Sequence, residues 1–162
     1  MRKQIFVFLV ILLFLIGCAS EISGGKILKH GIYTSTEVKI VKAEGTAAEK
    51  RRISEDVEFT ENTTQIPAIL GNTFGIKYVI NGKPEGRQIN IRVLWKHPPM
   101  KNPQKEKAST ISEHTRKAKI GNIIWNGYQF DEEWELVAGK WTIHIYHKDQ
   151  KLLEKTFTVY MP

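Results

Sequence analysis

The sequence predicts an all-β, antiparallel sandwich, and three observations favour it. Apolar residues recur with a period of two along most of the chain after residue 27. Turn-forming clusters such as NGKPEG and HKDQ separate these alternating runs. Long apolar helical periods do not occur in this part of the sequence. About six to eight short strands, each with one apolar face, are therefore expected to form two sheets around a single core.

The alternation is clearest in two pairs of runs. NTFGIKYVING and RQINIRVLWK are joined by NGKPEG, so they are expected to form a hairpin. WTIHIY and LLEKTFTVY are joined by HKDQ. The residues that share an apolar face in these runs are Phe74, Ile76, Tyr78, Ile80, Ile89, Ile91, Val93, Trp95, Trp141, Ile143, Ile145, Leu153, Phe157 and Val159. Earlier strands are expected around residues 32–40 and 57–59.

One stretch interrupts the pattern. Three prolines and four lysines between Lys96 and Lys107 predict a surface loop, with Pro98-Pro99 ending the preceding strand. Residues 104–119 fit either a strand or a short helix. Ala108 and Ile111 would lie on one helical face, whereas the serine and threonine content disfavours a helix.

The chain begins with the features of a secretory signal peptide. Arg2 and Lys3 precede an unbroken apolar run over residues 5–16. As a helix this run would span about 18 Å, which is short against a bilayer core of roughly 30 Å. Residues 1–17 are therefore expected to be a signal peptide, and Cys18, the one cysteine of the chain, follows it directly.

The segment Leu15-Ile16-Gly17-Cys18 resembles the lipobox of bacterial lipoproteins. The resemblance implies a diacylglycerol thioether on Cys18, cleavage before it, and acylation of the new amino group by a fatty acid such as palmitate. A thiolate suits this chemistry because it is a strong nucleophile. Ala19 implies the periplasmic side of the outer membrane if the host is Gram-negative. The alternative is ordinary cleavage after Ala19 or Ser20, which leaves a soluble secreted protein.

The mature chain is expected to contain one domain. Residues 18–26 are predicted to be a lipidated flexible tether, because ASEISGGK is small, polar and glycine-rich. Residues 27–162 are enough for one core, which must form without a disulfide. Apart from Arg2 and Lys3, all of the 24 lysines and arginines lie in the mature chain, against 17 acidic residues. This mild excess favours the membrane and anionic envelope polymers as partners, and an exported protein is not expected to bind nucleic acid.

The sequence contains no catalytic or metal-binding signature. His144 and His147 are three residues apart, which places them on opposite faces of a strand, and His30, His97 and His114 are scattered. The acidic run from Asp131 to Glu135 is predicted to be a solvated turn. A serine elbow, a glycine-rich phosphate loop and a thiol that stays free after lipidation are all missing from the sequence. We therefore predict that the protein is not an enzyme and uses no metal or cofactor.

The basic segments are the remaining candidates for contact with a partner. Lys50-Arg51-Arg52, the lysines of residues 96–107, and Arg116, Lys117 and Lys119 could form one positive surface facing the bilayer. The candidate surface contacts are Trp95, His97, Lys101, Lys105 and Lys107. The other tryptophans of the domain, Trp125, Trp134 and Trp141, are expected to pack in or beside the core.

A set of short motifs resembles one bacterial family. The motifs are GIY from Gly31, FGIKYVING from Phe74, HPP from His97, WE from Trp134, GKWT from Gly139 and the closing LLEKTFTV. In this order, over about residues 27–160, they are similar to the family called domain of unknown function 3859. The resemblance implies an immunoglobulin-like β-sandwich exported to the cell envelope. It implies no activity, and no functional residue is carried over from it.

These observations predict a membrane-anchored, non-catalytic module of the bacterial envelope that binds or supports another envelope component. That component could be a protein or an anionic polymer. The alternative is an envelope hydrolase or metal-dependent enzyme whose site is not visible in the sequence. A concave pocket with converging polar groups would favour the enzyme, whereas flat sheet edges would favour an adaptor.

Overall fold

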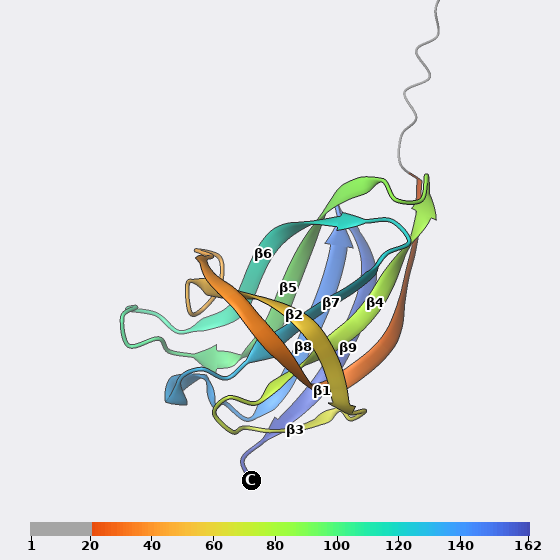
Figure 1. The fold of residues 1–162 in the computed structure, drawn as a ribbon. Helices are drawn as coiled ribbons and strands as arrows, with labels where there is room; N and C mark the ends of the chain where they lie inside the picture. The colour runs from red at the N-terminus through yellow and green to blue at the C-terminus, as the bar shows by residue number, and fades with distance from the viewer. Residues whose placement is uncertain (1–20) are drawn as a thin grey trace, which may run out of the picture.

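The computed structural model describes residues 21–162, and these residues form two packed β-sheets (Figure 1). The elements are β1 (Glu21–Lys42), β2 (Lys50–Glu61), β3 (Gln65–Pro67), β4 (Thr73–Lys83), β5 (Gln88–Met100), β6 (Ser109–Lys119), β7 (Ile123–Gln129), the 3-10 turn η1 (Glu133–Glu135), β8 (Gly139–His147) and β9 (Gln150–Tyr160). One sheet has the order β2-β1-β4-β7, and the other has the order β3-β9-β8-β5-β6. Neighbouring strands are antiparallel except for the short β3, which is parallel to β9. The predicted sandwich is confirmed.

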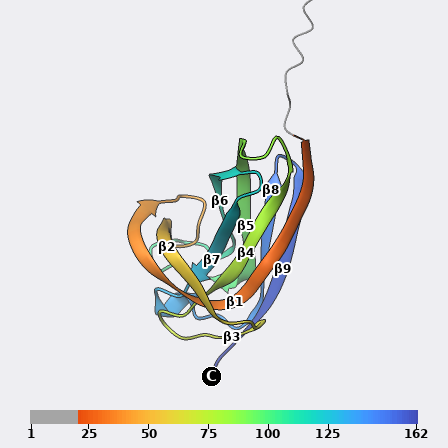
Figure 2. The ribbon, with the colours of Figure 1, turned by 45° about the vertical axis from the view of Figure 1, so that its right-hand side comes forward.

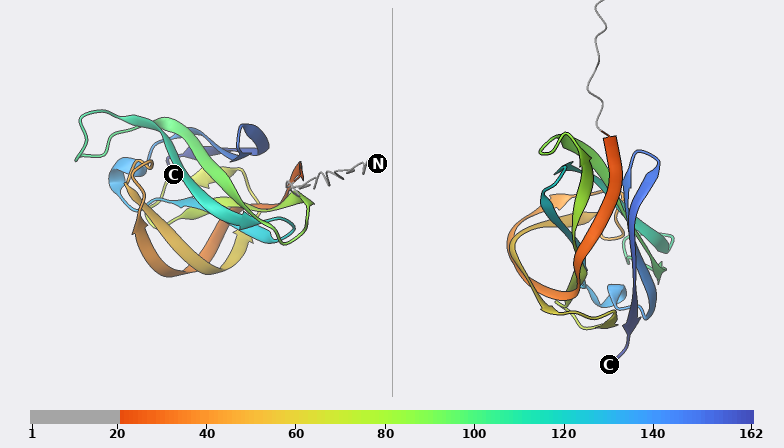
Figure 3. Two further views of the ribbon diagram at one scale, coloured as in Figure 1. Left: turned by 90° about the horizontal axis from the view of Figure 1, so that it is seen from above. Right: turned by 90° about the vertical axis from the view of Figure 1, so that its right-hand side faces the viewer.

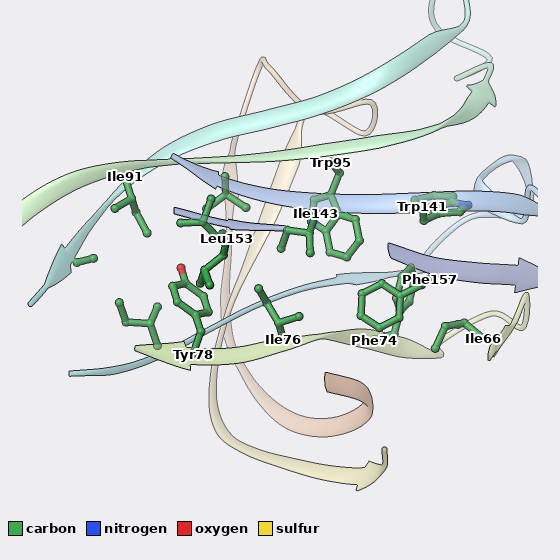
Figure 4. Packing of buried hydrophobic residues seen from close by; sticks show 14 of the residues in the cluster. Ile66, Phe74, Ile76, Tyr78, Ile91, Trp95, Trp141, Ile143, Leu153 and Phe157 are labelled. Carbon is green, nitrogen blue, oxygen red and sulfur yellow. The ribbon is translucent and has the colours of Figure 1, made fainter. Parts of the chain in front are cut away.

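The core lies between the two sheets, where the apolar faces of β4, β5, β8 and β9 meet (Figure 4). Every residue that the alternation places on an apolar face is buried. Phe74 is central to the core, because Trp141 and Phe157 pack edge-on against its ring with centroids 5.9 Å and 5.3 Å away. Such edge-on pairs stabilise a core beyond the burial of their area alone.

The start of the domain differs from the prediction. Glu21 pairs with Lys83 and Ile22 with Gly82, so β1 already runs beside β4 at residue 21. Ile22 also packs against the core. The predicted tether is therefore wrong for residues 21–26, because this segment gains a full strand partner. Cys18 and the signal peptide lie outside the described residues.

Residues 97–119 also differ in part from the prediction. β5 continues through Pro98 and Pro99 to Met100, so the two prolines do not end the strand. They lie where the pairing with β6 is irregular, between Lys96 and Met100, and a proline at such a bulge removes no ladder hydrogen bond. Residues 109–119 form β6, so the strand alternative is confirmed and the helix alternative is wrong.

A row of three glycines crosses the first sheet. Gly31 of β1 pairs with Gly75 of β4, which in turn pairs with Gly127 of β7. A β-carbon on Gly75 would lie 2.2 Å from the carbonyl oxygen of Asn126, and one on Gly31 would lie 2.0 Å from that of Glu61. Side chains at these positions would collide with the backbone, so glycine is required for the close approach of the strands.

Beyond this row, residues 33–61 form an arm, which consists of the second half of β1, its turn and β2. Figures 2 and 3 show the arm curling away from β4 and back over the open side of the sandwich. Its turn, residues 43–49, docks on the other sheet. The amide of Glu113 in β6 donates to the Gly45 carbonyl at 2.8 Å, and the amide of Ala47 donates to Ser112 Oγ at 3.0 Å. The arm thus bridges the edges of the two sheets.

Candidate functional site

The docked arm encloses a cavity of about 340 Å³ against β6 and β7. Its walls combine residues that are far apart in the sequence. They include Tyr33 and Arg51 of the arm, His114 and Arg116 of β6, and Trp125 and Tyr128 of β7. The volume is at the lower end of the range found for small-molecule sites. The cavity is therefore the candidate site of the described part of the chain.

Glu135 forms the acidic wall of the cavity and is almost completely buried. Its Oε1 accepts a hydrogen bond from the Tyr128 hydroxyl at 2.6 Å. Its Oε2 accepts bonds from the amides of Asp131 and Glu132 at 2.7 Å and 2.9 Å. Burial raises the pKa of the Glu135 carboxyl above its usual value, and these three hydrogen bonds oppose that rise. Both oxygens are occupied, so Glu135 fastens η1 to β7 and is not a free base.

Asp131, on the same wall, is neutralised by cations of the arm. Arg52 Nη2 donates to Asp131 Oδ1 at 2.7 Å, and Arg52 Nε donates to Oδ2 at 3.4 Å. Lys50 Nζ lies 3.6 Å from the same carboxylate, and Glu37 forms an ion pair with Arg52 from the neighbouring strand. The prediction of a solvated acidic turn is therefore wrong for Asp131 and Glu135. Glu132 and Glu135 are three residues apart, as in a capping box, and this spacing could have indicated from the sequence that Glu135 bonds to the backbone.

Two arginines without acidic partners also line the cavity. Within residues 21–162, no carboxylate lies within 4.0 Å of the guanidinium of Arg51 or Arg116. Arg116 Nη1 donates to the Trp125 carbonyl at 3.1 Å. Burial and the charge of Arg116 both lower the pKa of Arg51. The two side chains repel each other, and most of their side-chain N–H donors have no acceptor among residues 21–162.

His114 lies between Ser112 and Arg116 on the face of β6 that lines the cavity. Its Nε2 is shielded from solvent and has no hydrogen-bond partner among the described residues. Burial, together with the charges of Arg51 and Arg116, lowers the pKa of His114 to about 4. The imidazole is therefore neutral at pH 7, and a buried ring nitrogen without a partner is an expensive feature for a fold to keep.

Ser112 and His97 form a hydrogen-bonded pair at the edge of the cavity. His97 Nδ1 donates to the Pro98 carbonyl at 2.9 Å, because a carbonyl can only accept. His97 Nε2 then accepts from the Ser112 hydroxyl at 3.1 Å. Ser112 Oγ in turn accepts the Ala47 amide of the arm. Both side chains are buried, and the pair holds the turn of the arm in place.

The predicted surface contacts divide into two groups. Trp95 and His97 are 3% and 6% exposed, so their prediction as surface contacts is wrong. They lie on the same inward face of β5 as Val93. The alternation of apolar residues in the sequence already indicated this orientation. Lys101 and Lys107 are exposed, whereas Lys105 is half-buried and pairs with Glu49 of the arm at 3.2 Å.

The predicted positive surface is also divided. Lys50, Arg51 and Arg52 meet Arg116 and Lys117 around the cavity, as the prediction of a joint basic surface required. The lysines of residues 96–107 are not part of the lining, and neither is Lys119. Of the three tryptophans expected at the core, Trp141 is fully buried, Trp134 packs against the core, and Trp125 lines the cavity.

The histidines near the C-terminus have separate partners. His144 Nε2 lies 3.3 Å from Glu154, and His147 Nδ1 lies 2.9 Å from the Asn90 carbonyl. Within the described residues, no three histidine, cysteine or acidic side chains gather to hold a metal ion. The same part of the chain has no helix that is long and apolar enough to cross a membrane.

The two sheets, their order and their common core define the chain as an immunoglobulin-like β-sandwich protein. A crystal structure of an immunoglobulin-like protein from Pseudomonas aeruginosa, at 1.50 Å resolution, has a TM-score of 0.60 to this chain. The two sequences are 26% identical, over 88% of this chain and 97% of that chain. The model of the family Domain of unknown function (DUF3859) matches residues 23–159, and the chain belongs to this family. Comparison with curated proteins gives no match.

Proposed function

We propose that this protein is a lipid-anchored, non-catalytic binding protein of the bacterial envelope, and that its ligand occupies the cavity under the arm. The observation that carries the proposal is the cavity itself. An arm that crosses from one sheet to the other forms one side of it, and its walls hold polar groups without partners among the described residues. Natural proteins keep such destabilising features mainly where function requires them.

A pocket of this kind was expected to favour an enzyme over an adaptor, but its chemistry favours binding. Of its two carboxylates, Glu135 uses both oxygens in hydrogen bonds, and Asp131 is paired with Arg52 and Lys50. A carboxyl acts as a general acid or base only where it is free to exchange a proton with a substrate, and these two carboxyls are already paired. The groups that have no acidic partner are the cations Arg51 and Arg116, which can bind and orient an anion, and beside them His114 Nε2 has no hydrogen-bond partner among the described residues.

The lipobox at Cys18 supports anchoring to the membrane. β1 starts at Glu21, so Cys18 is at most about 10 Å of extended chain away from the sandwich. A lipid on Cys18 would therefore hold the end of the sandwich formed by Glu21 and Lys83 close to the bilayer. By the lipobox resemblance, this bilayer is the outer membrane in a Gram-negative host.

Complementation of a strain that lacks the gene tests both parts of the proposal. Cys18→Ser removes the anchor, and loss of palmitate labelling confirms that it does. Ser35→Trp fills the cavity, since Ser35 lines it, whereas Thr36→Trp is the matched control on the exposed face of the same strand. We expect Cys18→Ser and Ser35→Trp to fail and Thr36→Trp to complement, at equal protein levels. Full complementation by Ser35→Trp would refute the role of the cavity.

Hydrolysis is the second candidate function, and the Ser112–His97 pair is the observation that favours it. The serine hydroxyl donates to His97 Nε2, and the Pro98 carbonyl fixes the tautomer, as in a nucleophile–base pair. Covalent labelling of Ser112 by a fluorophosphonate probe would establish this function. The binding proposal expects no labelling, because the Ala47 amide occupies Ser112 Oγ.

A further inference from the structure

The charges around the cavity do not balance. Asp131 is already paired with Arg52 and Lys50, and Glu135 is satisfied by Tyr128 and two backbone amides. These carboxylates are therefore not available to Arg51 and Arg116. The guanidinium groups of Arg51 and Arg116 therefore line a partly buried space in which each carboxylate is already paired with another group.

The free donors of these cations converge with a third group. Arg51 comes from the arm, whereas Arg116 and His114 project from the same face of β6. One Nη1 donor of Arg116 bonds to the Trp125 carbonyl. The Arg51 guanidinium has no ion pair with a described residue, although its backbone pairs with Val41 in the sheet. His114 Nε2 is buried without a partner, and a neutral imidazole can present this nitrogen as an N–H donor. Two guanidinium groups without acidic partners and one neutral donor therefore line the same space.

Four aromatic side chains also line the cavity, among small and polar residues such as Ser35 and Thr73. Tyr33, Trp95, Trp125 and Tyr128 border the cavity, and the Tyr33 ring is buried where it faces β7. Aromatic walls bury the flat or apolar body of a ligand, and a few polar groups fix its orientation. A simple inorganic ion would use the arginines but would leave this apolar surface in contact with water.

We infer that the cavity binds a small organic anion, with its phosphate or carboxylate group on Arg51, Arg116 and His114 and its apolar body against Tyr33 and Trp125. Guanidinium groups match both kinds of oxyanion, because their parallel N–H donors reach two oxygens at once. The anion would cancel the repulsion between the two arginines and supply the acceptor that His114 lacks. This inference names the ligand class of the proposed function and rests on it.

Titration of the detergent-solubilised protein with defined probes tests the inference. The probes are phenyl phosphate, benzoate, inorganic phosphate and the neutral benzyl alcohol, in a phosphate-free buffer of fixed ionic strength. We expect saturable calorimetric binding of phenyl phosphate or benzoate to one site, weaker binding of inorganic phosphate, and the weakest binding of benzyl alcohol. Glycerol phosphate and a short-chain phosphatidylglycerol then distinguish a free metabolite from a lipid headgroup as the source of the phosphate.

Three arginine-to-glutamine variants, each of which removes one positive charge, test whether Arg51 and Arg116 provide this binding. Arg51→Gln and Arg116→Gln should each weaken the anionic probes by roughly tenfold or more. Arg92→Gln is the control, since Arg92 lies on β5 outside the cavity, where it pairs with Glu113. Unchanged affinity of Arg51→Gln, or failure of every anionic probe to bind, would overturn the inference. If benzyl alcohol binds as tightly as benzoate and Ser35→Trp abolishes that binding, the anion specificity fails while the proposed binding function stands.

Discussion

The hydroxyl of Tyr33 lies against Gly127, 2.1 Å from the position that a β-carbon on Gly127 would occupy. Tyr33 opens the arm, and Gly127 ends the glycine row across the sheet from which the arm departs. Phe59 of β2 packs on the other side of the Tyr33 ring at 5.2 Å. The absence of a side chain at Gly127 therefore lets the base of the arm lie directly on β7 and close the cavity at this end.

Gly127→Ala should destabilise the domain by about 1–3 kcal/mol, because the added methyl overlaps the Tyr33 ring and the Phe74 carbonyl. Urea unfolding of the single variants and the double variant measures this energy. In a Tyr33→Ala background the same substitution should be less costly, since the ring is gone. An identical cost in both backgrounds would show that Tyr33 and Gly127 are not coupled.

Ile143→Asp should unfold the domain or leave it only marginally stable. Ile143 is fully buried between the sheets, and an unpaired charge there costs several kcal/mol in addition to the lost packing. His144→Asn on the opposite face of β8 should be milder, because His144 contacts Glu154 and Tyr146 and not the core. Far-UV circular dichroism during thermal unfolding compares the two variants. Equal loss of stability would contradict the observed phase of β8.

His114 should make the domain less stable as the pH falls from 6.5 to 4. The folded protein protonates His114 only at a pKa of about 4, whereas the unfolded chain does so near 6.5, so the unfolded state binds more protons in this range. Relative to His114→Gln, the natural protein should lose about 2 kcal/mol of stability between pH 7 and pH 5. Other histidines contribute equally to both proteins. If the unfolding free energies of the two proteins, measured with urea, changed with pH in parallel, the lowered pKa of His114 in the folded protein would be contradicted.

Replacement of Arg51 and of Arg52, which are neighbours on β2, should change the stability of the domain in opposite directions. Arg51→Gln should stabilise the empty domain by at most about 1 kcal/mol, because it removes a charge that is repelled by Arg116 and is partly screened by solvent. Arg52→Gln should destabilise it by about 1–3 kcal/mol, because Asp131 loses its closest partner. Thermal unfolding in a buffer without phosphate or carboxylates measures both. A loss of stability in Arg51→Gln as large as that in Arg52→Gln would mean that Arg51 has a structural role.

The core could be predicted from the sequence because each central strand has one apolar face. A period of two assigns Phe74, Ile143 and Phe157 to the interior without knowledge of their partners. The arm could not be predicted in this way. Residues 33–61 are largely polar on both faces, and their position depends on docking contacts such as that between Ala47 and Ser112, which are 65 residues apart.

The cavity could be predicted only in part. The basic runs around Arg51 and Arg116 indicated a joint positive surface, but not that the docked arm makes it concave. The glycines gave a usable signal, since Gly31, Gly75 and Gly127 each interrupt a strand pattern where two backbones approach closely. The motifs GIY and FGIKYVING therefore mark the base of the arm as well as the family.

Native mass spectrometry of the protein released from its own envelope in a mild detergent shows directly whether the cavity is occupied in the cell. We expect the natural protein and Thr36→Trp to carry one additional small molecule that is anionic when released by denaturation. Ser35→Trp and Arg51→Gln should lack it while remaining folded. Recovery of the natural protein without any bound small molecule, or equal occupancy in Ser35→Trp, would contradict the assignment of the cavity as the binding site.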